Sequence, residues 1–310
     1  MKKSPLDILS LFPVRKTLKQ KKVFREWVKE YFQALGYECN LEKTGLMGRN
    51  VIVGDPQHAK HLITAHYDTC AGSLLPNFIT PCNIWIYLLY QILFTGILML
   101  PGIVLAAVTF GITKQIDTAT VVFLVSLFAA MLLVLYGPAN RHNNNDNTSG
   151  VVTVLEIARS LPDEYWDDVC FVLFDLEEAG LLGSSSYRAN HKKESNRQLV
   201  WNFDCVGDGD EILFFPSRRV KKNPGMMKIL QKCAAVHEEK RITIHEKGFH
   251  FYPSDQVNFP YGIGIAACHQ GKVGLYIDKI HTAKDTVLQE DNVSLLRQAL
   301  LAAIACGEEE

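Results

Sequence analysis

The sequence has no charged residue between Asp68 and Lys114, although 21% of the chain is charged. Within this stretch, residues 84–110 are apolar over a length that can cross a bilayer, and a second uncharged run covers residues 118–136 after a short polar turn. We expect an inserted hydrophobic hairpin over residues 81–138, with transmembrane helices at 84–110 and 118–136. The alternatives are a pair of buried core helices and a hydrophobic dimerisation arm, which would make the protein a homo-oligomer.

Other absences narrow the class of protein. With 32 basic and 33 acidic residues, the chain lacks the positive surplus of a nucleic-acid-binding protein. Its eight cysteines show no CxxC spacing, which argues against a disulfide framework and favours a reducing compartment. The first residues lack the long apolar stretch and the small-residue cleavage site of a signal peptide. Together with Arg141 after the second apolar run, these features predict an integral membrane protein whose soluble domain is cytoplasmic.

Outside the hairpin, short apolar runs alternate with helical patterns. Buried strands are expected at residues 61–65, 170–174 and 199–203, and helices at residues 21–35, 151–160, 224–239 and 292–306. This alternation predicts an α/β fold with helices on both faces of a central mixed, mostly parallel sheet. No repeat or long linker divides the chain, so residues 1–310 are expected to form a single domain that carries the hairpin.

Side chains that can bind metals follow the predicted strands. They are His66 and Asp68 after the first strand, Glu177 and Glu178 after the second, Asp204 after the third, Asp146 in a polar loop, and His281 after a late strand. Alone, each is compatible with a capped turn, but the carboxyl ends of parallel strands meet at one edge of a sheet. Imidazole and carboxylate suit Zn²⁺, and one bridging carboxylate would allow two ions to bind.

Five short motifs occur along the chain outside the hairpin. They are AHYDT (65–69), NDNTSG (145–150), DLEEAGLLGS (175–184), NFDCVG (202–207) and IHTAKDT (280–286). In this order they resemble the co-catalytic di-zinc aminopeptidase family, which includes leucine aminopeptidases, aminopeptidase S, glutamate carboxypeptidase II and glutaminyl cyclase. The resemblance implies the three-layer zinc-peptidase fold and two zinc ions per chain.

The resemblance also implies a set of metal ligands. His66, Asp146 and Asp204 would bind one zinc ion, and Asp146, Glu178 and His281 would bind the other. Asp146 would bridge the two ions, and it is the only charged side chain in its motif.

Further roles follow from the same motifs. Glu177 would be the general base and then the acid, and Asp68 would orient His66. Asp285 would either orient His281 in the same way or cap a helix.

Two features depart from the family pattern. The family has a Ser-Asp-His triplet before its last strands, whereas residues 254–256 read Ser-Asp-Gln, which affects the expected substrate pocket, including Asp255. Tyr252 is a candidate for the tyrosine that helps to hold the oxyanion, with core packing as the alternative. The second departure is the hairpin, which lies between the first and second ligands.

These observations predict a membrane-anchored metallo-aminopeptidase that hydrolyses the first peptide bond of a peptide by means of a zinc-activated water, with Glu177 as the base. Its substrates would include hydrophobic or membrane-associated peptides. The alternatives are a glutaminyl cyclase-like acyltransferase and an inactive membrane scaffold or receptor.

Overall fold

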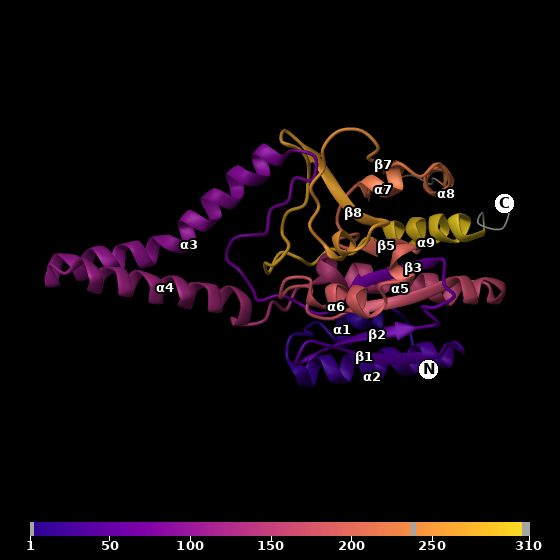
Figure 1. The fold of residues 1–310 in the computed structure, drawn as a ribbon, viewed down its shortest axis with the longest axis horizontal. Helices are drawn as coiled ribbons and strands as arrows, with labels where there is room; N and C mark the ends of the chain where they lie inside the picture. The colour runs from indigo at the N-terminus through magenta and orange to yellow at the C-terminus, as the bar shows by residue number, and fades with distance from the viewer. Residues whose placement is uncertain (1–2, 237–239, 306–310) are drawn as a thin grey trace.

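Nine β-strands form one mixed sheet in the computed structural model, which describes residues 3–236 and 240–305 (Figure 1). In spatial order they are β1 (Cys39–Thr44), β2 (Gly48–Val53), β4 (Val169–Phe174), β3 (His61–His66), β5 (Leu199–Phe203), β8 (Gly262–Gly271), β6 (Glu211–Pro216) and β7 (Ile242–Ile244), while β9 (Gly274–Tyr276) pairs with β8. The four central strands β4, β3, β5 and β8 are parallel, and antiparallel pairs flank them. The predicted α/β fold with a central mixed sheet is confirmed.

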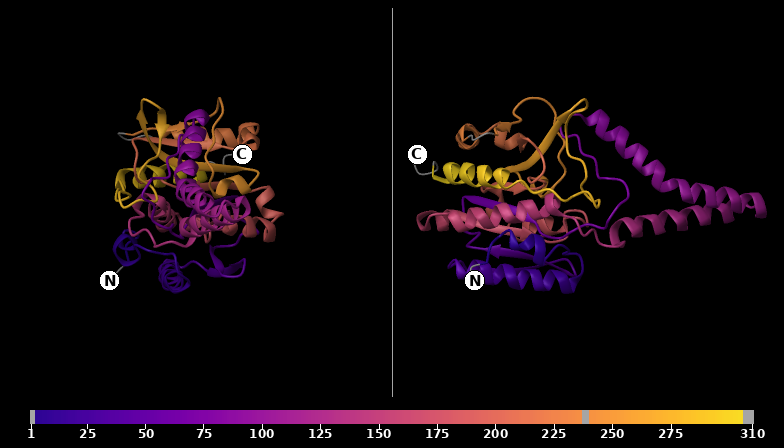
Figure 2. Two further views of the ribbon diagram at one scale, coloured as in Figure 1. Left: turned by 90° about the vertical axis from the view of Figure 1, so that its left-hand side faces the viewer. Right: turned by 180° about the vertical axis from the view of Figure 1, so that it is seen from behind.

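Helices cover both faces of the sheet (Figure 2). One face packs in the larger hydrophobic core against α2 (Leu18–Ala34), α5 (Gly150–Ser160), α8 (Pro224–Ala235) and α9 (Glu290–Ala305). The other face packs against α6 (Leu182–Asn190), whose Tyr187 joins a smaller core. Strands β3, β4 and β5 are therefore buried along their whole length, which explains why they read as continuous apolar runs.

The bounds of the helices differ by a few residues from the sequence prediction. Helix α2 begins before residue 21 because Thr17 and Gln20 form a capping box ahead of it. Helix α8 ends at Ala235, and the predicted end at residue 239 lies outside the described residues, as does Cys306 after α9. The remaining helical segments are short: α1 (Asp7–Leu11), α7 (Arg218–Lys221), η1 (Asn144–Ser149), η2 (Asp163–Asp168), η3 (Glu194–Asn196) and η4 (Asp255–Asn258).

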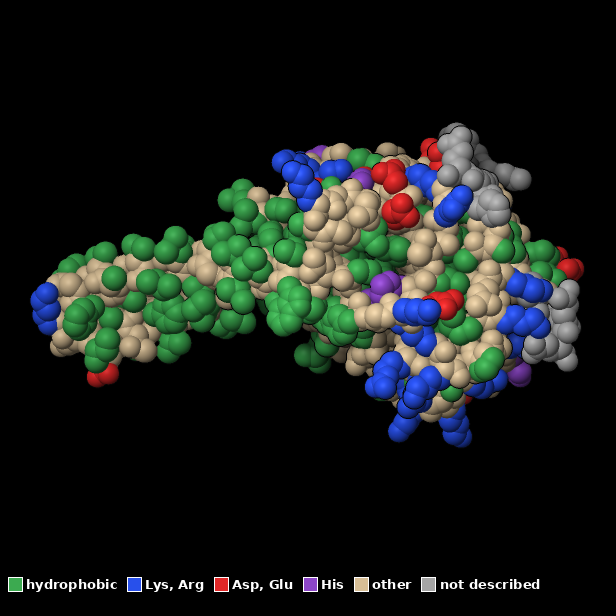
Figure 3. Space-filling view, turned by 90° about the horizontal axis from the view of Figure 1, so that it is seen from above, with side chains coloured by type: hydrophobic (Ala, Val, Ile, Leu, Met, Phe, Trp, Pro, Cys, Tyr) green, Lys and Arg blue, Asp and Glu red, His purple; other side chains and the backbone are tan. Residues whose placement is uncertain are grey.

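Helices α3 (Ile84–Thr113) and α4 (Ile116–Tyr136) form a long hairpin that projects from one end of the α/β domain (Figure 1). They are slightly longer than the predicted 84–110 and 118–136. Along the hairpin only Gly102 and Ala119 are buried, and its shaft is covered by apolar side chains, with charged ones gathered at the tip (Figure 3). At 1.5 Å per residue, α3 is about 45 Å long and α4 about 31 Å, and both exceed the roughly 30 Å of a bilayer core.

The chain segments before and after the hairpin run side by side inside the domain, although the domain ends of α3 and α4 lie apart (Figure 1). A β-bridge joins Ala71 to Ala139, the Gly72 N–H donates to the Pro138 carbonyl at 2.8 Å, and the Asn140 N–H donates to the Cys70 carbonyl at 3.2 Å. This stem connects the carboxyl end of β3 to the segment before α5. The hairpin therefore leaves the domain at the edge of the sheet where the parallel strands end.

Candidate metal centre

Five predicted ligands lie together at this edge of the sheet. His66 is the last residue of β3, and Asp204 directly follows β5. Glu178 lies in the loop after β4, Asp146 in η1 before α5, and His281 in the loop after β9. Because the parallel strands all end here, residues up to 215 positions apart in the sequence meet within a few ångströms.

Asp146 lies between the two histidines. Its Oδ1 is 3.3 Å from His66 Nε2, and its Oδ2 is 3.0 Å from His281 Nε2. On the His66 side, Asp204 Oδ1 lies 3.7 Å from Nε2, and on the His281 side, Glu178 Oε2 lies 3.4 Å from Nε2. A carboxylate with one oxygen directed at each imidazole has the arrangement that a bridge between two ions requires.

Two observations show that these residues fit zinc ions. Glu178 Oε1 and Asp204 Oδ1 are buried, and neither has a hydrogen-bond partner within the described part of the chain, which leaves both free for a cation. In addition, two ligand atoms about 2.1 Å from one tetrahedral zinc ion lie about 3.4 Å apart, close to the separations observed here. The nitrogen and oxygen donors also match the ligand preference of zinc.

The electrostatics of the cluster point the same way. Burial raises the pKa of Glu178 to about 7, although His281 opposes the shift. Burial would lower the pKa of His281, but Glu178 and Asp146 raise it to about 9. His66 likewise has its pKa raised well above the ordinary value, because the carboxylates of Glu177, Asp146 and Asp204 outweigh its burial. At both histidines the surrounding carboxylates thus outweigh burial, which indicates an excess of negative charge that metal cations would neutralise.

Asp68 supports the loop that carries the acidic pair. Its carboxylate accepts hydrogen bonds from the backbone N–H groups of Glu177 at 3.1 Å and Glu178 at 3.3 Å. His66 Nδ1 is nearer to the Asp68 carbonyl, at 3.2 Å, than to its carboxylate, at 3.6 Å. The backbone of Asp68 thus orients His66, while its side chain positions the two glutamates, a contact that the sequence did not indicate.

The backbone is left-handed at three positions in the site. Leu176, directly before Glu177, has φ of 60°, Cys205, directly after Asp204, has φ of 55°, and His281 itself has φ of 64°. Such values are uncommon for residues other than glycine and cluster at functional sites. Here they turn the chain sharply at the strand ends, so that the side chains face the cluster.

Asp285 holds the loop of the central carboxylate. Its two oxygens accept the backbone N–H groups of Asn145 at 2.7 Å and Asp146 at 3.1 Å. Burial is the main reason that the pKa of Asp285 is raised to about 8. These contacts hold the first turn of η1, as a capping carboxylate would, while the alternative role of orienting His281 stays a prediction.

The residues expected in the substrate pocket have distinct positions. Tyr252 is buried and stacked on Phe215, and its hydroxyl donates to the Asp204 carbonyl at 2.8 Å, so it holds the backbone of a predicted ligand. Asp255 accepts a hydrogen bond from Ser184 Oγ, and its Oδ2 is buried with no partner among the described residues. Burial raises the pKa of Asp255 to about 7.

The glutamine that departs from the family triplet has a structural role here. Gln256 Nε2 donates to the Tyr252 carbonyl at 2.7 Å, and Gln256 Oε1 accepts from Asn202 Nδ2 at 3.0 Å. The side chain thereby links the segment before η4 to the end of β5. A neutral histidine has its donor and its acceptor on separate ring nitrogens, so it would not place them as the single amide group of Gln256 does.

Three buried residues near the cluster escaped the sequence prediction. Cys70 lies with Glu178 and His281, and Cys205 with Asp146, close enough for the thiols to share a cation. Arg15 is fully buried, donates to the Tyr67 carbonyl and to Thr148 Oγ1, and brings positive charge towards the acidic cluster. For the cysteines, the only sequence signal is their position directly after the motif residues Thr69 and Asp204.

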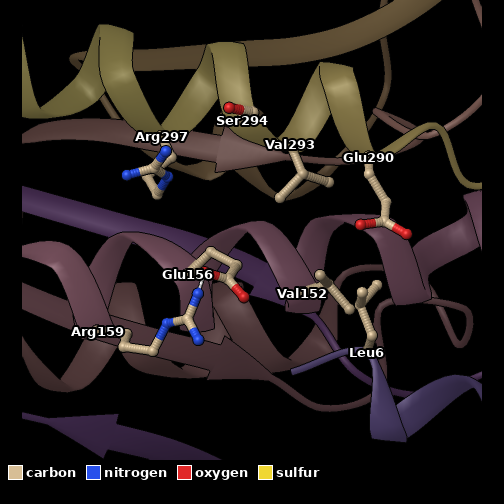
Figure 4. A pocket seen from close by; sticks show the side chains of 8 residues that line it. All are labelled: Leu6, Val152, Glu156, Arg159, Glu290, Val293, Ser294 and Arg297. Atoms are coloured by element: carbon tan, nitrogen blue, oxygen red, sulfur yellow. Dashed lines mark hydrogen bonds and ion pairs between the residues drawn. The ribbon is translucent and has the colours of Figure 1, made fainter. Parts of the chain in front are cut away.

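A surface pocket of about 300 Å³ lies elsewhere, between α5 and α9 (Figure 4). Glu156 and Arg159 of α5 form an ion pair at its rim, opposite Val293 and Arg297 of α9. None of the predicted site residues lines it.

The chain matches known proteins both in sequence and in fold. The model of Peptidase family M28 matches residues 137–305, more than half of the chain. Aminopeptidase YwaD of Bacillus subtilis (strain 168) is 41% identical over 66 residues, which are 20% of this chain, and the match spans only 14% of that protein's length.

Solved structures also resemble the whole chain. The LapA aminopeptidase of Legionella pneumophila has a TM-score of 0.60 at 15% identity, over 99% of this chain and 70% of that one. The glutaminyl cyclase of Porphyromonas gingivalis has a TM-score of 0.58 at 16% identity, over 98% of this chain and 97% of that one. At such low identities these likenesses show the fold alone.

Proposed function

Because the chain belongs to peptidase family M28, we propose that it is a membrane-anchored, zinc-dependent aminopeptidase that binds two zinc ions. The observation that carries this proposal is the position of Asp146, with one oxygen 3.3 Å from His66 Nε2 and the other 3.0 Å from His281 Nε2. Two adjacent sites of this composition suit hydrolysis of a peptide bond.

The residues divide into two groups around the bridge. His66, Asp146 and Asp204 would hold one zinc ion, and Asp146, Glu178 and His281 the other. When bound, the ions would supply positive charge that polarises the scissile carbonyl and stabilises the negative charge of the transition state.

Glu177 is suited to move the proton. It follows Leu176 in the strained turn, and its N–H is held by Asp68. Burial raises its pKa well above the ordinary value, and Glu178 and Asp255 add to this effect, while His66 opposes it. A carboxylate with a raised pKa takes a proton readily near neutral pH, so Glu177 would accept a proton from the attacking water and donate it to the departing amine.

The hairpin would anchor the enzyme in the bilayer. Both helices have the length and hydropathy of membrane spans. The turn between them, with Lys114 and Asp117, would lie on the far side of the membrane. Lys16 and Arg141 lie near the domain end of α4, which favours a cytoplasmic domain. A site beside the stem favours apolar or membrane-associated peptides as substrates.

Replacing Glu177 with Gln tests the role of the base. In full-length protein in lipid nanodiscs, we expect turnover of an aminoacyl anilide to fall by about 10²–10⁴-fold. Zinc content, measured by mass spectrometry, should stay at about two ions per chain because the ligands are untouched. The matched control is Glu164→Gln, which changes an exposed carboxylate and should leave turnover unaltered. Wild-type turnover by Glu177→Gln would rule out this role.

The glutaminyl cyclase likeness supports one alternative, because its fold matches nearly the full length of both chains. A peptide with an N-terminal glutamine separates the two reactions. An aminopeptidase releases free glutamine, whereas a cyclase releases ammonia and retains the ring on the peptide. An inactive scaffold would do neither and would bind no zinc.

A further inference from the structure

Exposed apolar side chains surround the metal centre at the hairpin end of the domain. They are Leu46 and Met47 in the β1–β2 turn, Leu74 after β3, Leu182 at the start of α6, Phe249 before η4, and Val257 in η4. Leu46 and Leu74 are as exposed as in an extended chain, at 102% and 101%. We call this set the apolar rim. Apolar groups gathered around one site, rather than scattered singly, indicate an interaction surface.

The topology places four of the six rim residues beside the acidic loop. Strand β2 is antiparallel to β4, so the turn that contains Leu46 and Met47 lies beyond the carboxyl end of β4. Thr44 Oγ1 donates to the Leu182 carbonyl at 3.0 Å, which joins this turn to the start of α6. Next to Val257, Asn258 Nδ2 donates to Ser184 Oγ at 2.8 Å, so η4 continues the same rim.

The other two rim residues, Leu74 and Phe249, lie towards the hairpin. Beside Leu74, the Ser73 N–H donates to the carbonyl of His281 at 2.8 Å. The segment that bears Phe249 is tied to the hairpin two residues later, where the Phe251 N–H donates to the Pro81 carbonyl at 2.8 Å. The ring of Phe251 also packs on Tyr87 of α3, with centroids 5.3 Å apart. The rim is therefore continuous with the base of the hairpin.

Aromatic and basic residues mark the level of the bilayer surface at this base. Trp85, Tyr87 and Tyr90 occupy the first two turns of α3, and Tyr136 ends α4. Trp and Tyr favour the interface of a membrane, where a ring can contact both chains and headgroups. Lys16 Nζ donates to the Leu135 carbonyl at 2.7 Å, next to Tyr136. Helix α4 is only about as long as the bilayer core is thick, so Tyr136, its last residue, would lie at the membrane interface. The domain follows directly after Tyr136, and its edge would therefore contact the headgroups.

We propose that the apolar rim contacts the bilayer surface and seats the metal centre at the level of the headgroups, where it receives peptide amino termini that emerge from the membrane. The inference rests on the proposed membrane anchoring and peptidase activity. Lipid fits this surface better than a second copy of the chain, because the rim is continuous with the hairpin and with its aromatic belt. Apolar side chains on several neighbouring loops suit a fluid interface, into which each can insert.

Contact with lipid is tested by fluorescence, without any need for activity. An environment-sensitive dye is attached to the new thiol of Leu46→Cys or Val257→Cys in the full-length protein. The protein is placed in nanodiscs of phosphatidylcholine and phosphatidylglycerol. Wild-type protein treated with the same dye gives the signal from the native cysteines, which is subtracted. Lipids with a nitroxide near the headgroup should quench both dyes by about twofold or more. A dye at Gln57→Cys, exposed on the opposite edge before β3, should not be quenched. Equal quenching at all three positions, or none at the rim, overturns the proposal.

The consequence for substrates is tested with the triple variant Leu46→Ser, Met47→Ser and Val257→Ser. Its activity on a soluble aminoacyl anilide should equal that of the wild type, because no ligand or base is changed. Its activity on a lipid-anchored peptide with the same first residue should fall by about tenfold. Leu41→Ser, on β1 of the same strand pair but away from the turn, is the matched control and should lower neither activity.

The outcomes separate the two proposals. If the wild type hydrolyses neither substrate, the proposed function fails, while the quenching still decides whether the rim touches lipid. If the wild type hydrolyses both, and the triple variant loses neither activity or loses both equally, then the rim does not present membrane-bound substrates.

Discussion

Replacing Asp175 with Asn should lower the free energy of unfolding by about 3–5 kcal/mol, because it removes the negative charge from a buried network. Asp175 directly follows β4 and is completely buried. Its carboxylate forms an ion pair with Lys21 Nζ and lies 3.7 Å from Arg25 Nη1. It also accepts hydrogen bonds from Tyr67 Oη at 2.8 Å and from the Arg49 N–H at 2.9 Å.

The magnitude follows from what an asparagine cannot replace. The side chain of Lys21 is only 5% exposed, so its ammonium would be left in the interior without a counter-ion. Breaking a buried pair by removing one partner costs about 3–5 kcal/mol. Asparagine also has one acceptor oxygen instead of two. Either Lys21 therefore loses its acceptor, or Tyr67 and Arg49 lose theirs, and each buried group left without a partner lowers the stability by about 1–3 kcal/mol. These terms overlap, and the larger one sets the expected loss.

Urea unfolding in detergent micelles, followed by tryptophan fluorescence, measures this loss. The matched control is Asp168→Asn, which breaks the 2.8 Å pair with Lys60, whose side chain is 58% exposed, and should cost less than about 1 kcal/mol. Adding Lys21→Met to Asp175→Asn should restore part of the stability, because it removes the stranded charge. If Asp175→Asn costs no more than Asp168→Asn, the buried network does not stabilise the fold.

Two further changes test the hairpin and the acid stability of the sheet. A Cβ at Gly102 would lie 3.2 Å from Ser126, so Gly102→Leu should push α3 away from α4. In thermal unfolding this should lower the stability by about 1–3 kcal/mol. Gly96→Leu is the control, because no atom lies within 4 Å of a Cβ at Gly96. Burial lowers the pKa of His61 to about 4, and the neutral ring accepts a hydrogen bond at Nδ1 from the indole of Trp201. The stabilisation of the fold by neutral His61 is therefore complete above pH 6.5 and is lost as the pH falls towards 4. Between pH 7 and pH 5, the free energy of unfolding of His61→Gln should therefore fall by about 2 kcal/mol less than that of the wild type, as measured by urea unfolding. Equal falls in the two proteins would contradict the conclusion that His61 is buried in its neutral form.

The positions of the predicted ligands could be derived from the sequence because each depends on a local pattern. An apolar run that stops at a polar residue marks the end of a buried strand, and parallel strands end at one edge. His66 and Asp204 follow this rule directly, and Glu177 and Glu178 lie a few residues beyond it. A single segment of sequence therefore predicts that its polar side chain lies at the carboxyl edge of the sheet. It does not predict which atoms of the other side chains it contacts.

The supporting contacts were not predictable, because they join segments far apart in the chain. Lys21 pairs with Asp175 across 154 positions, and a lysine in an amphipathic helix carries no sign that it will be buried. The hydrogen bonds from Glu177 and Glu178 to Asp68 involve backbone N–H groups, which every residue but proline has. The same holds for Asp285, which binds two N–H groups of η1. Such contacts depend on the fold as a whole, which local patterns do not specify.

The insertion point of the hairpin links the membrane to the chemistry. The stem, bridged at Ala71 and Ala139, lies between His66 at the end of β3 and Asp146 before α5, and the family match begins directly after α4. Arg15 contacts both sides of this insertion through the Tyr67 carbonyl and Thr148. An insertion at the amino ends of the strands would have turned the metal centre away from the hairpin. Because it occurs at their carboxyl ends, the point of insertion alone makes the candidate metal centre face the hairpin.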